Sequence, residues 1–405
     1  MILFSAIEKK FIRQHLTGDV RQLLLRPHPT GMDIRRLATQ IAARQKARDK
    51  LPAWYANENL LFPSALSVEQ ASSEQTAHYK ASLVSGARLL DLTGGMGVDA
   101  WAFAQRVGQV TYVERQPELA QLAAYNLPLL GADNVLVLTG DGLTVVDQVT
   151  ESVDWIYLDP HRRDGQGGRV VQLADCEPDV SRADVPGKLL AKADRILLKT
   201  SPMIDIDATI RQLIGMATHA AITVHVVAVQ GEVREVLFII RRLGNSEPVV
   251  YINAVNLLSD SRLTFSFSRD EERTSDVPFG DPRAYIYEPN AAVLKAGAFR
   301  LVGSRYGFTK LSPNSHLYTS DEYRADFPGR VFVLEHVIKP DRSALRALLP
   351  TMKANLTVRN FPQSVAELRK KLNLYEGGHV YIFATSLLNG DKRLLITRKA
   401  DPAAD

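Results

Sequence analysis

Residues 88–99 read Arg-Leu-Leu-Asp-Leu-Thr-Gly-Gly-Met-Gly-Val-Asp, and this stretch decides the fold. A short apolar run ends at Asp91, a turn holds Gly94, Gly95 and Gly97, and apolar residues at helical spacing follow. This pattern predicts a strand, a tight turn and a helix. Glycines let a backbone approach a ligand closely, and the first N–H groups of a helix point towards it. The stretch therefore predicts a nucleotide-type pocket at the carboxyl end of a strand.

Three further strand-like runs also end in an acidic residue or an acidic turn. The run 109–113 ends on Glu114, the run 134–138 is followed by Asp141, and the run 153–158 ends on Asp159. An acid about 20 residues after the glycines is typical of one that holds a pair of ribose hydroxyls. A glycine turn kept only for steric reasons is the alternative. The row of acids weighs against it, because a purely structural sheet does not need acids at its strand ends.

The order and spacing of these motifs resemble the class I S-adenosylmethionine-dependent methyltransferases over residues of about 85–242. A dehydrogenase more often shows Gly-x-Gly-x-x-Gly, whereas this chain has Gly-Gly-x-Gly. The resemblance implies an α/β fold with a Rossmann-like seven-stranded sheet, which here would end in an antiparallel hairpin of 222–229 and 235–241. It also implies S-adenosyl-L-methionine as cofactor, with the methionine part at the glycine turn, the ribose on Glu114 and the adenine near Asp141. The candidate cofactor residues in these motifs are Asp91, Thr93, Gly94, Gly95, Gly97, Glu114 and Asp141.

Longer phrases are similar to a bacterial group of methyltransferases with a THUMP-like C-terminal domain, over most of the chain. They are Leu-Ser-Val-Glu-Gln-Ala-Ser-Ser-Glu at 66–74, the glycine turn at 91–99, Asp-Pro-His-Arg-Arg-Asp at 159–164, Lys-Thr-Ser-Pro-Met at 199–203 and Val-Arg-Asn-Phe-Pro at 358–362. The eukaryotic trimethylguanosine synthases are more distantly similar. THUMP domains elsewhere bind RNA, so this resemblance implies RNA as the substrate.

Asp159, Pro160, His161 and Arg162 take the catalytic position of the resembled superfamily. In its amine methyltransferases the usual motif is Asn/Asp-Pro-Pro-aromatic, which orients the target amine. Here His161 replaces the second proline and Arg162 replaces the aromatic residue, and this departure weakens the interpretation as an amine methyltransferase. We expect Arg162 and Arg163 to bind phosphate or to stack on a base, and His161 to stack or act as a base. The alternative is that both arginines only pair with Asp164 or Asp175.

Two further segments are expected at the edge of the site. Lys199 ends the next predicted strand and either faces the substrate or pairs with Asp159. A polar helix over 67–81, capped by Ser67, is predicted to fold over the cofactor pocket, with Gln70 and Thr76 as cofactor-binding candidates. A surface lysine and a solvent-facing helix are the alternatives.

The composition is ordinary for a globular protein, with 45% hydrophobic and 23% charged residues among 405. The single cysteine, Cys176, excludes an internal disulfide and fits a reducing compartment. Charged residues Glu8, Lys9 and Lys10 lie where a signal peptide or membrane helix would be apolar. The nine histidines show no ligand-spaced pair. We therefore expect a cytoplasmic protein without a membrane span or a metal site.

Positive charge is concentrated at the two ends of the sequence. Residues 1–60 hold 11 Lys and Arg against 5 Asp and Glu, and residues 330–400 hold 13 against 5. This favours a polyanionic partner, with 359–362 and Arg369, Lys370 and Lys371 as a candidate RNA surface. A solvated surface is the alternative.

Three parts are expected along the chain. They are a helical N-terminal domain at 1–84, an S-adenosylmethionine-binding methyltransferase domain at 85–245 and a small α+β THUMP-like region at 246–405. The stretch 245–280 is strand-rich and has no chemical motif. Two rival functions remain open, a small-molecule methyltransferase and an RNA-binding protein with an inactive methyltransferase core. The sequence gives no indication of the oligomeric state.

Overall fold

The structure is a computed structural model, and it describes residues 3–25, 31–163, 172–182, 184–216, 220–243 and 249–400. The chain divides into two compact units. Unit 1 comprises residues 1–223 and 235–249, and unit 2 comprises residues 224–234 and 250–405. The expected boundary between 245 and 246 lies outside the described residues, so the division into three domains stays a prediction.

Unit 1 is built on a sheet whose strands follow the order β9-β7-β4-β1-β2-β3. All neighbours in this row are parallel except β9, which is antiparallel to β7. From β1 the chain proceeds to β2 and β3 on one side and to β4 and β7 on the other. Ligands bind where a doubly wound sheet reverses its order, which here is at the carboxyl ends of β1 and β4. The strands are β1 (Gly86–Asp91), β2 (Val107–Glu114), β3 (Val135–Thr139), β4 (Val153–Leu158), β7 (Ala193–Thr200) and β9 (Glu232–Arg242).

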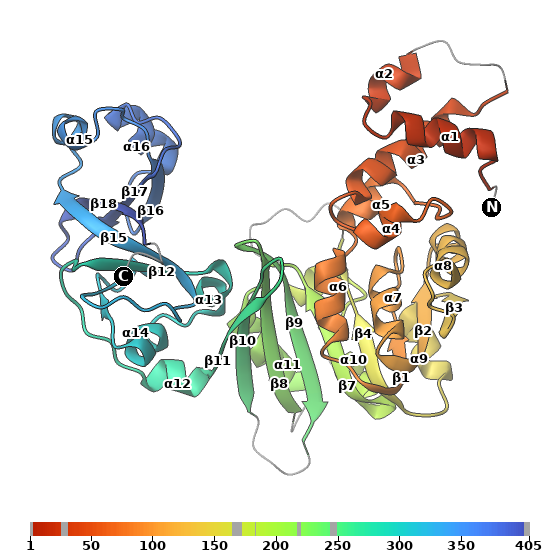
Figure 1. The fold of residues 1–405 in the computed structure, drawn as a ribbon. Helices are drawn as coiled ribbons and strands as arrows, with labels where there is room; N and C mark the ends of the chain where they lie inside the picture. Colours follow the sequence, from red (N-terminus) through yellow and green to blue (C-terminus); the bar gives the residue numbers. More distant parts are fainter. Residues whose placement is uncertain are drawn as a thin grey trace. The chain divides into compact units, whose positions relative to one another are not determined.

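Helices alternate with these strands and confirm the expected α/β, Rossmann-like class. Helices α6, α7 and α8 lie along one face of the sheet (Figure 1). From β4 to β7 the chain moves across the sheet in the opposite direction. Because such crossovers are right-handed, α10 lies on the other face, where it packs against β7. The elements are α7 (Val98–Ala104), α8 (Pro117–Leu129), α9 (Gly142–Gln148), α10 (Asp184–Lys192) and α11 (Ile206–Met216), with a two-stranded sheet of β5 (His161–Arg162) and β6 (Cys176–Glu177) and a 3-10 turn, η1 (Leu173–Asp175).

The chain ahead of β1 is helical and has a small core of its own around Leu37 and Ile41. The single helix expected over 67–81 is wrong. Ala71 and Ser73 have extended backbones with ψ of 159° and 157°, and this break separates α5 from α6. Ser73 caps α6 by accepting the N–H of Thr76. The helices are α1 (Ala6–His15), α2 (Val20–Leu25), α3 (Ile34–Ala47), α4 (Pro52–Ala56), α5 (Ala65–Gln70) and α6 (Glu74–Ala81).

Unit 2 holds a seven-stranded sheet in the order β13-β14-β12-β15-β18-β17-β16, and the strands β11, β10 and β8, which are neighbours in that order. Only β16 and β17 are a parallel pair in the seven-stranded sheet. The strand β8 begins in unit 1 and runs into unit 2. The strands are β8 (Ala220–Val229), β10 (Val250–Leu257), β11 (Arg262–Ser268), β12 (Tyr285–Pro289), β13 (Thr309–Lys310), β14 (Tyr318–Ser320), β15 (Gly329–Ile338), β16 (Asn355–Arg359), β17 (Val380–Ser386) and β18 (Lys392–Lys399).

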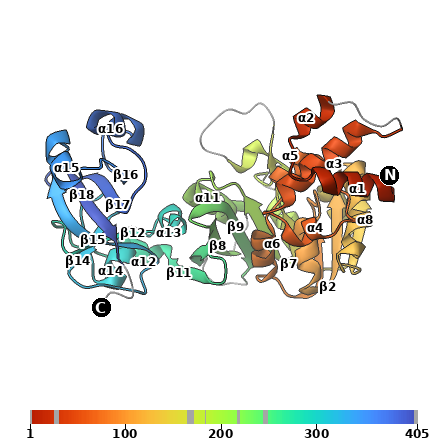
Figure 2. The ribbon, with the colours of Figure 1, turned by 45° about the horizontal axis from the view of Figure 1, so that its top comes forward.

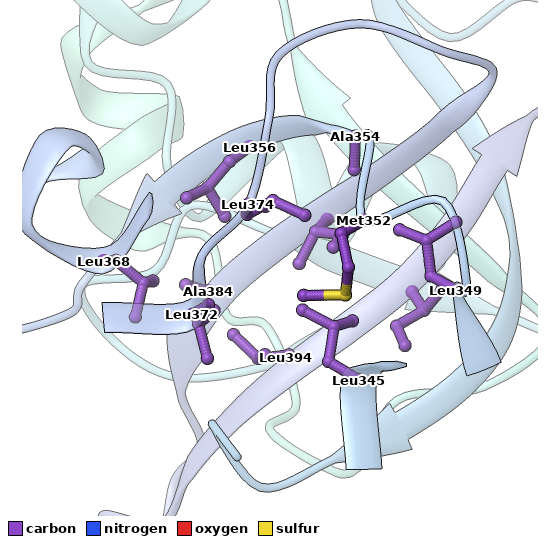
Figure 3. Close-up of a cluster of buried hydrophobic side chains, with 12 residues drawn as sticks. Leu345, Leu349, Met352, Ala354, Leu356, Leu368, Leu372, Leu374, Ala384 and Leu394 are labelled. Carbon is purple, nitrogen blue, oxygen red and sulfur yellow. The ribbon is translucent and has the colours of Figure 1, made fainter. Parts of the chain in front are cut away.

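The helices of unit 2 are short, and two of them cover the strands at the end of the chain. Helices α15 and α16 lie beside β16, β17 and β18 (Figure 2). Leucines dominate the buried cluster between them, which includes Leu345, Leu368 and Leu394 (Figure 3). Ser364 and Glu367 form a capping box at the start of α16. The helices are α12 (Arg269–Thr274), α13 (Ala291–Ala296), α14 (Leu301–Tyr306), α15 (Arg342–Leu348) and α16 (Val365–Leu372).

Candidate active site

Asp91 ends β1 and is completely buried. Its Oδ1 accepts the N–H of Thr93 at 3.0 Å, whereas Oδ2 has no hydrogen-bond partner among the described residues. Burial raises the pKa of Asp91 well above its usual value. A buried carboxylate oxygen without a partner is costly to maintain. The site therefore fits a ligand with a cationic group, as S-adenosylmethionine has in its ammonium and sulfonium.

The glycine turn is held close against β2. The Gly94 N–H donates to the Val113 carbonyl at 2.8 Å, and the Tyr112 hydroxyl donates to the Gly95 carbonyl at 2.6 Å. Gly95 and Gly97 have φ of 55° and 89°, a region that favours glycine. Gly94 and Gly95 remain half-buried, so a ligand can reach the backbone of the turn.

Glu114 ends β2 and binds two backbone N–H groups. Its Oε2 accepts from Gly95 at 2.8 Å and its Oε1 accepts from Gln116 at 2.7 Å. A carboxylate has about four lone-pair sites, so acceptor capacity remains for a diol. These contacts fix the carboxylate beside the glycine turn, where the ribose of the expected cofactor would be held.

Asp141 caps α9 at the edge of a cavity of about 380 Å³. Its Oδ1 accepts the N–H of Thr144 at 3.0 Å and the Thr144 hydroxyl at 3.2 Å. The same cavity is lined by Arg163, so one predicted cofactor residue and one predicted substrate residue share a pocket. Charged residues of both signs form most of its wall, namely Asp141, Asp147, Arg163, Glu177, Asp179, Arg182, Asp184 and Lys188.

Asp159 follows β4 and forms an ion pair with Lys199 of β7. The Asp159 N–H also donates to the Thr93 hydroxyl at 2.6 Å, which connects this loop to the glycine turn. The Asp159 side chain is 33% exposed and the Lys199 side chain 14%. Burial works to lower the pKa of Lys199, but the carboxylates of Asp159, Glu235 and Asp99 raise it above its usual value. Lys199 is therefore a cation at neutral pH.

A buried network of charged and polar groups contains Lys80 of α6 and Glu235 of β9. The fully buried Lys80 donates to both oxygens of Glu235 at 2.9 Å and to the Ser72 hydroxyl at 3.2 Å. The Lys80 Nζ also lies 3.3 Å from Asp99 Oδ1. Asp99 Oδ2 accepts from the hydroxyls of Ser72 and Tyr157, each at 2.8 Å.

The charges in this network have shifted pKa values. Burial works to raise the pKa of Asp99, but Lys80 and Lys199 lower it below its usual value. For Glu235, burial outweighs both lysines and raises the pKa. Lys80 lies within the polar helix expected over 67–81 but was not itself a site candidate, and Asp99, Tyr157 and Glu235 were not predicted as site residues. The available signal was a charged residue beside the apolar run 236–240 of a buried strand.

His161 and Arg162 of the predicted catalytic loop form the short strand β5. His161 and Arg162 pair with Glu177 and Cys176 of β6. His161 is exposed and Arg162 is half-buried. Pro160 is buried beside Asp159.

Arg163 makes ion pairs of 3.3 and 3.7 Å with Glu177 and Asp179. Its N–H donates to the Asp175 carbonyl at 2.9 Å. The alternative of a structural ion pair thus holds for Arg163 with different carboxylates from those expected. Asp164, one of the expected partners, lies outside the described residues.

Gln70 and Thr76 lie on different helices. Gln70 ends α5 and is exposed, whereas Thr76 lies in α6, is buried and donates its hydroxyl to the Ser73 carbonyl at 3.1 Å. Their roles towards the cofactor stay predictions. Over the ranges that the structure describes, no group of three or more His, Cys, Asp or Glu could hold a metal ion. None of the described helices is long and apolar enough to cross a membrane.

Comparisons with known proteins match both units. Family models match residues 58–157 as protein-L-isoaspartate (D-aspartate) O-methyltransferase, residues 285–328 as a ferredoxin-like domain and residues 329–399 as a THUMP-like domain. A crystal structure described as a candidate methyltransferase from Porphyromonas gingivalis is 38% identical with a TM-score of 0.86, and the match covers 99% of this chain and 100% of that one. A Mycobacterium tuberculosis protein, named an uncharacterised S-adenosylmethionine-dependent methyltransferase, is 24% identical over 76% of this chain and 79% of its own length.

Proposed function

This chain belongs to the S-adenosylmethionine-dependent methyltransferases that carry a ferredoxin-like and a THUMP-like domain, and on that premise we propose that it methylates RNA. S-adenosylmethionine supplies a methyl group on a positively charged sulfur. We propose that the turn at Thr93–Gly97 and the orphaned oxygen of Asp91 bind its methionine part, Glu114 its ribose and Asp141 its adenine. Gln70 and Thr76 are proposed at the edge of that pocket.

Asp159 is proposed as the residue that orients the acceptor, because it is partly exposed and lies next to the glycine turn through Thr93. Pro160, His161 and Arg162 complete the proposed catalytic loop. The proposed substrate contacts are Arg162, Arg163 and Lys199. For Arg163 the supporting observation is that it lines the same cavity as Asp141. Arginine suits phosphate recognition because its guanidinium donates in a planar fork.

The observation that carries the RNA proposal is the THUMP-like match together with its exposed cations. Lys353, Lys370 and Lys371 are exposed within residues 329–399. Carboxylates pair with some cations at each basic end, as in Arg13–Glu58 at one and Arg398–Glu335 at the other. Lys370 and Lys371 form no ion pair among the described residues, and this favours them as part of the RNA surface. A favourable interaction of Lys370 and Lys371 with the C-terminal end of α16 is the competing explanation for their positions.

Salt dependence of RNA binding tests this proposal. We expect the affinity of the full chain for total RNA to fall steeply with salt, because phosphate contacts release counterions. The double variant Lys370→Glu, Lys371→Glu should lower the slope of log affinity against log salt by about 2, roughly one per lost phosphate contact. The matched control reverses the exposed Arg262 and Arg273, which lie outside the THUMP-like match. Equal slopes in wild type and both variants would assign Lys370 and Lys371 to the solvated surface.

A small-molecule acceptor is the second candidate, and absence of any salt-dependent RNA binding would favour it. The cytoplasmic location and the distant similarity to trimethylguanosine synthases stay predictions.

A further inference from the structure

Three neighbouring strands of unit 1 each bring one charged residue to the same edge of the sheet. Leu158 of β4 is paired with Leu198 of β7, so Asp159 and Lys199 follow at the same level. Thr200 of β7 is paired with Val236 of β9, which places Glu235 at that edge as well. The charges therefore alternate along the edge as carboxylate, ammonium and carboxylate, and Lys80 adds a second ammonium through its hydrogen bonds to Glu235.

The ammonium of Lys199 is a permanent feature of this edge. Asp159, Glu235 and Asp99 together hold the pKa of Lys199 above its usual value in spite of burial. Together with its ion pair to Asp159, this keeps Lys199 a cation at neutral pH. Any acceptor that Asp159 orients will react close to a fixed positive charge.

The sign of that charge separates two classes of acceptor. A neutral amine becomes positive as it takes a methyl group, and a nearby ammonium opposes this change. A hydroxyl becomes more negative as its proton leaves, and a nearby ammonium stabilises the developing oxyanion. The Asp159 carboxylate suits either acceptor, because it can accept a hydrogen bond from an amine or take the proton of a hydroxyl, so the Lys199 ammonium is the charge that favours a hydroxyl. The loop at 161–162 agrees with this, because it lacks the proline and aromatic residue typical of amine methyltransferases.

We propose that the acceptor atom is a hydroxyl oxygen and, resting on the proposed RNA substrate, that it is the ribose 2′-hydroxyl. The acceptor oxygen forms a bond to the methyl carbon as the bond between methyl and sulfur breaks, and the electron pair of that bond stays on sulfur. The hydroxyl proton passes to the Asp159 carboxylate and from there to water. Lys199 stabilises the oxygen as it loses its proton. Lys80 and Glu235 are positioning residues. They act through the charge of Lys199 and by keeping the charged residues of this edge in their alternating order.

The first test locates the methyl group in the product. Total RNA from a strain lacking this gene is incubated with the full-length protein and tritiated S-adenosylmethionine, and is then hydrolysed in alkali. A methylated 2′-hydroxyl cannot attack the adjacent phosphodiester, so we expect the label in alkali-resistant dinucleotides. Label in ordinary mononucleotides would place the methyl on a base and overturn the hydroxyl inference, while the RNA proposal would stand.

The same incubation with the protein and small-molecule fractions of that strain separates the RNA proposal from the hydroxyl inference. Label confined to one of those fractions would contradict the RNA proposal. Mass spectrometry of the labelled product would then still decide the hydroxyl inference, because a methyl group on oxygen supports it and a methyl group on nitrogen overturns it.

The second test concerns Lys199. We expect Lys199→Met to lower turnover by about 100-fold or more, the range for losing an oxyanion stabiliser, and to leave S-adenosylhomocysteine affinity within threefold. Lys199→Arg keeps the charge and should recover a large part of the rate. Unchanged turnover in Lys199→Met would overturn the proposal. Should that variant fail to melt cooperatively, the Lys199→Arg rate and the product analysis decide.

Discussion

A side chain on Gly94 would occupy the space of the Tyr112 ring, because its Cβ would lie 2.1 Å from that ring. Tyr112 cannot move away easily, since it is fully buried and its hydroxyl donates to the Gly95 carbonyl. The tyrosine of β2 therefore sets both the path of the glycine turn and the residue type that the turn requires.

We expect Gly94→Ala to destabilise the fold by about 1–3 kcal/mol, the cost of overpacking, and to weaken S-adenosylhomocysteine binding. Thermal melting and calorimetric titration measure the two effects. The control is Gly187→Ala in α10, where nothing lies within 4 Å of the added Cβ. That change should be neutral or stabilise by up to about 1 kcal/mol, because alanine is the better helix former. Equal melting temperatures for the two variants would contradict the steric role of Tyr112.

Glu114→Ala should weaken S-adenosylmethionine binding by about 1.5–3 kcal/mol, or roughly 10- to 150-fold, as expected for hydrogen bonds to a charged group. Part of this loss comes from the turn itself, because Gly95 also loses its acceptor. Titration calorimetry with S-adenosylhomocysteine provides the measurement. Glu118→Ala is the control, since Glu118 is an exposed acid only four residues away. An affinity within twofold of wild type for Glu114→Ala would remove Glu114 from the cofactor site.

Asp91→Asn should stabilise the ligand-free protein increasingly as pH rises. Burial raises the pKa of Asp91 in the folded state, so the folded state binds the proton more tightly than the unfolded state. The wild type therefore loses stability as pH rises above the unfolded pKa, and the asparagine variant does not. The gain should approach about 1–3 kcal/mol at high pH and vanish at low pH. Melting curves from pH 4 to pH 8, with the exposed Asp194→Asn as control, test this. The same variant should bind S-adenosylmethionine more weakly, and tighter binding would contradict the proposed role of Asp91.

Lys80→Met should cost about 3–5 kcal/mol, because it leaves Glu235 and Asp99 buried without their counter-charge. The double variant Lys80→Met, Glu235→Leu should lose less stability, since one of the two carboxylates left without a counter-charge is gone. Urea denaturation gives the free energies of unfolding. The control is Arg48→Met, which removes an exposed ion pair with Asp49 and should cost no more than about 1 kcal/mol. A loss no larger than that of the control would show that water compensates the buried charges.

Local patterns predicted the strands and their acidic ends well. The run 153–158 coincides with β4, and the Glu114 that follows the run 109–113 ends β2. The helix over 67–81 failed because its spacing also fits two short helices, and only the extended backbone at Ala71 and Ser73 separates them. The buried network could not be predicted, because Lys80 and Glu235 are 155 residues apart and no local pattern links them. The pairing of Arg163 with Glu177 depends in the same way on how β5 and β6 come together.

The Lys80–Glu235 contact also has a consequence for folding during synthesis, because the chain leaves the ribosome from its N-terminus. Lys80 and the whole glycine turn emerge long before the strand that carries Glu235, and until then the ammonium of Lys80 has only Asp99 as a carboxylate partner within this network. A nascent chain that stops short of residue 235 can contain every cofactor motif and still lack the second carboxylate that its interior needs. Completion of the interior of unit 1 is thus tied to the synthesis of β9, so fragments cut before β9 should be substrates for proteolysis and not small working enzymes.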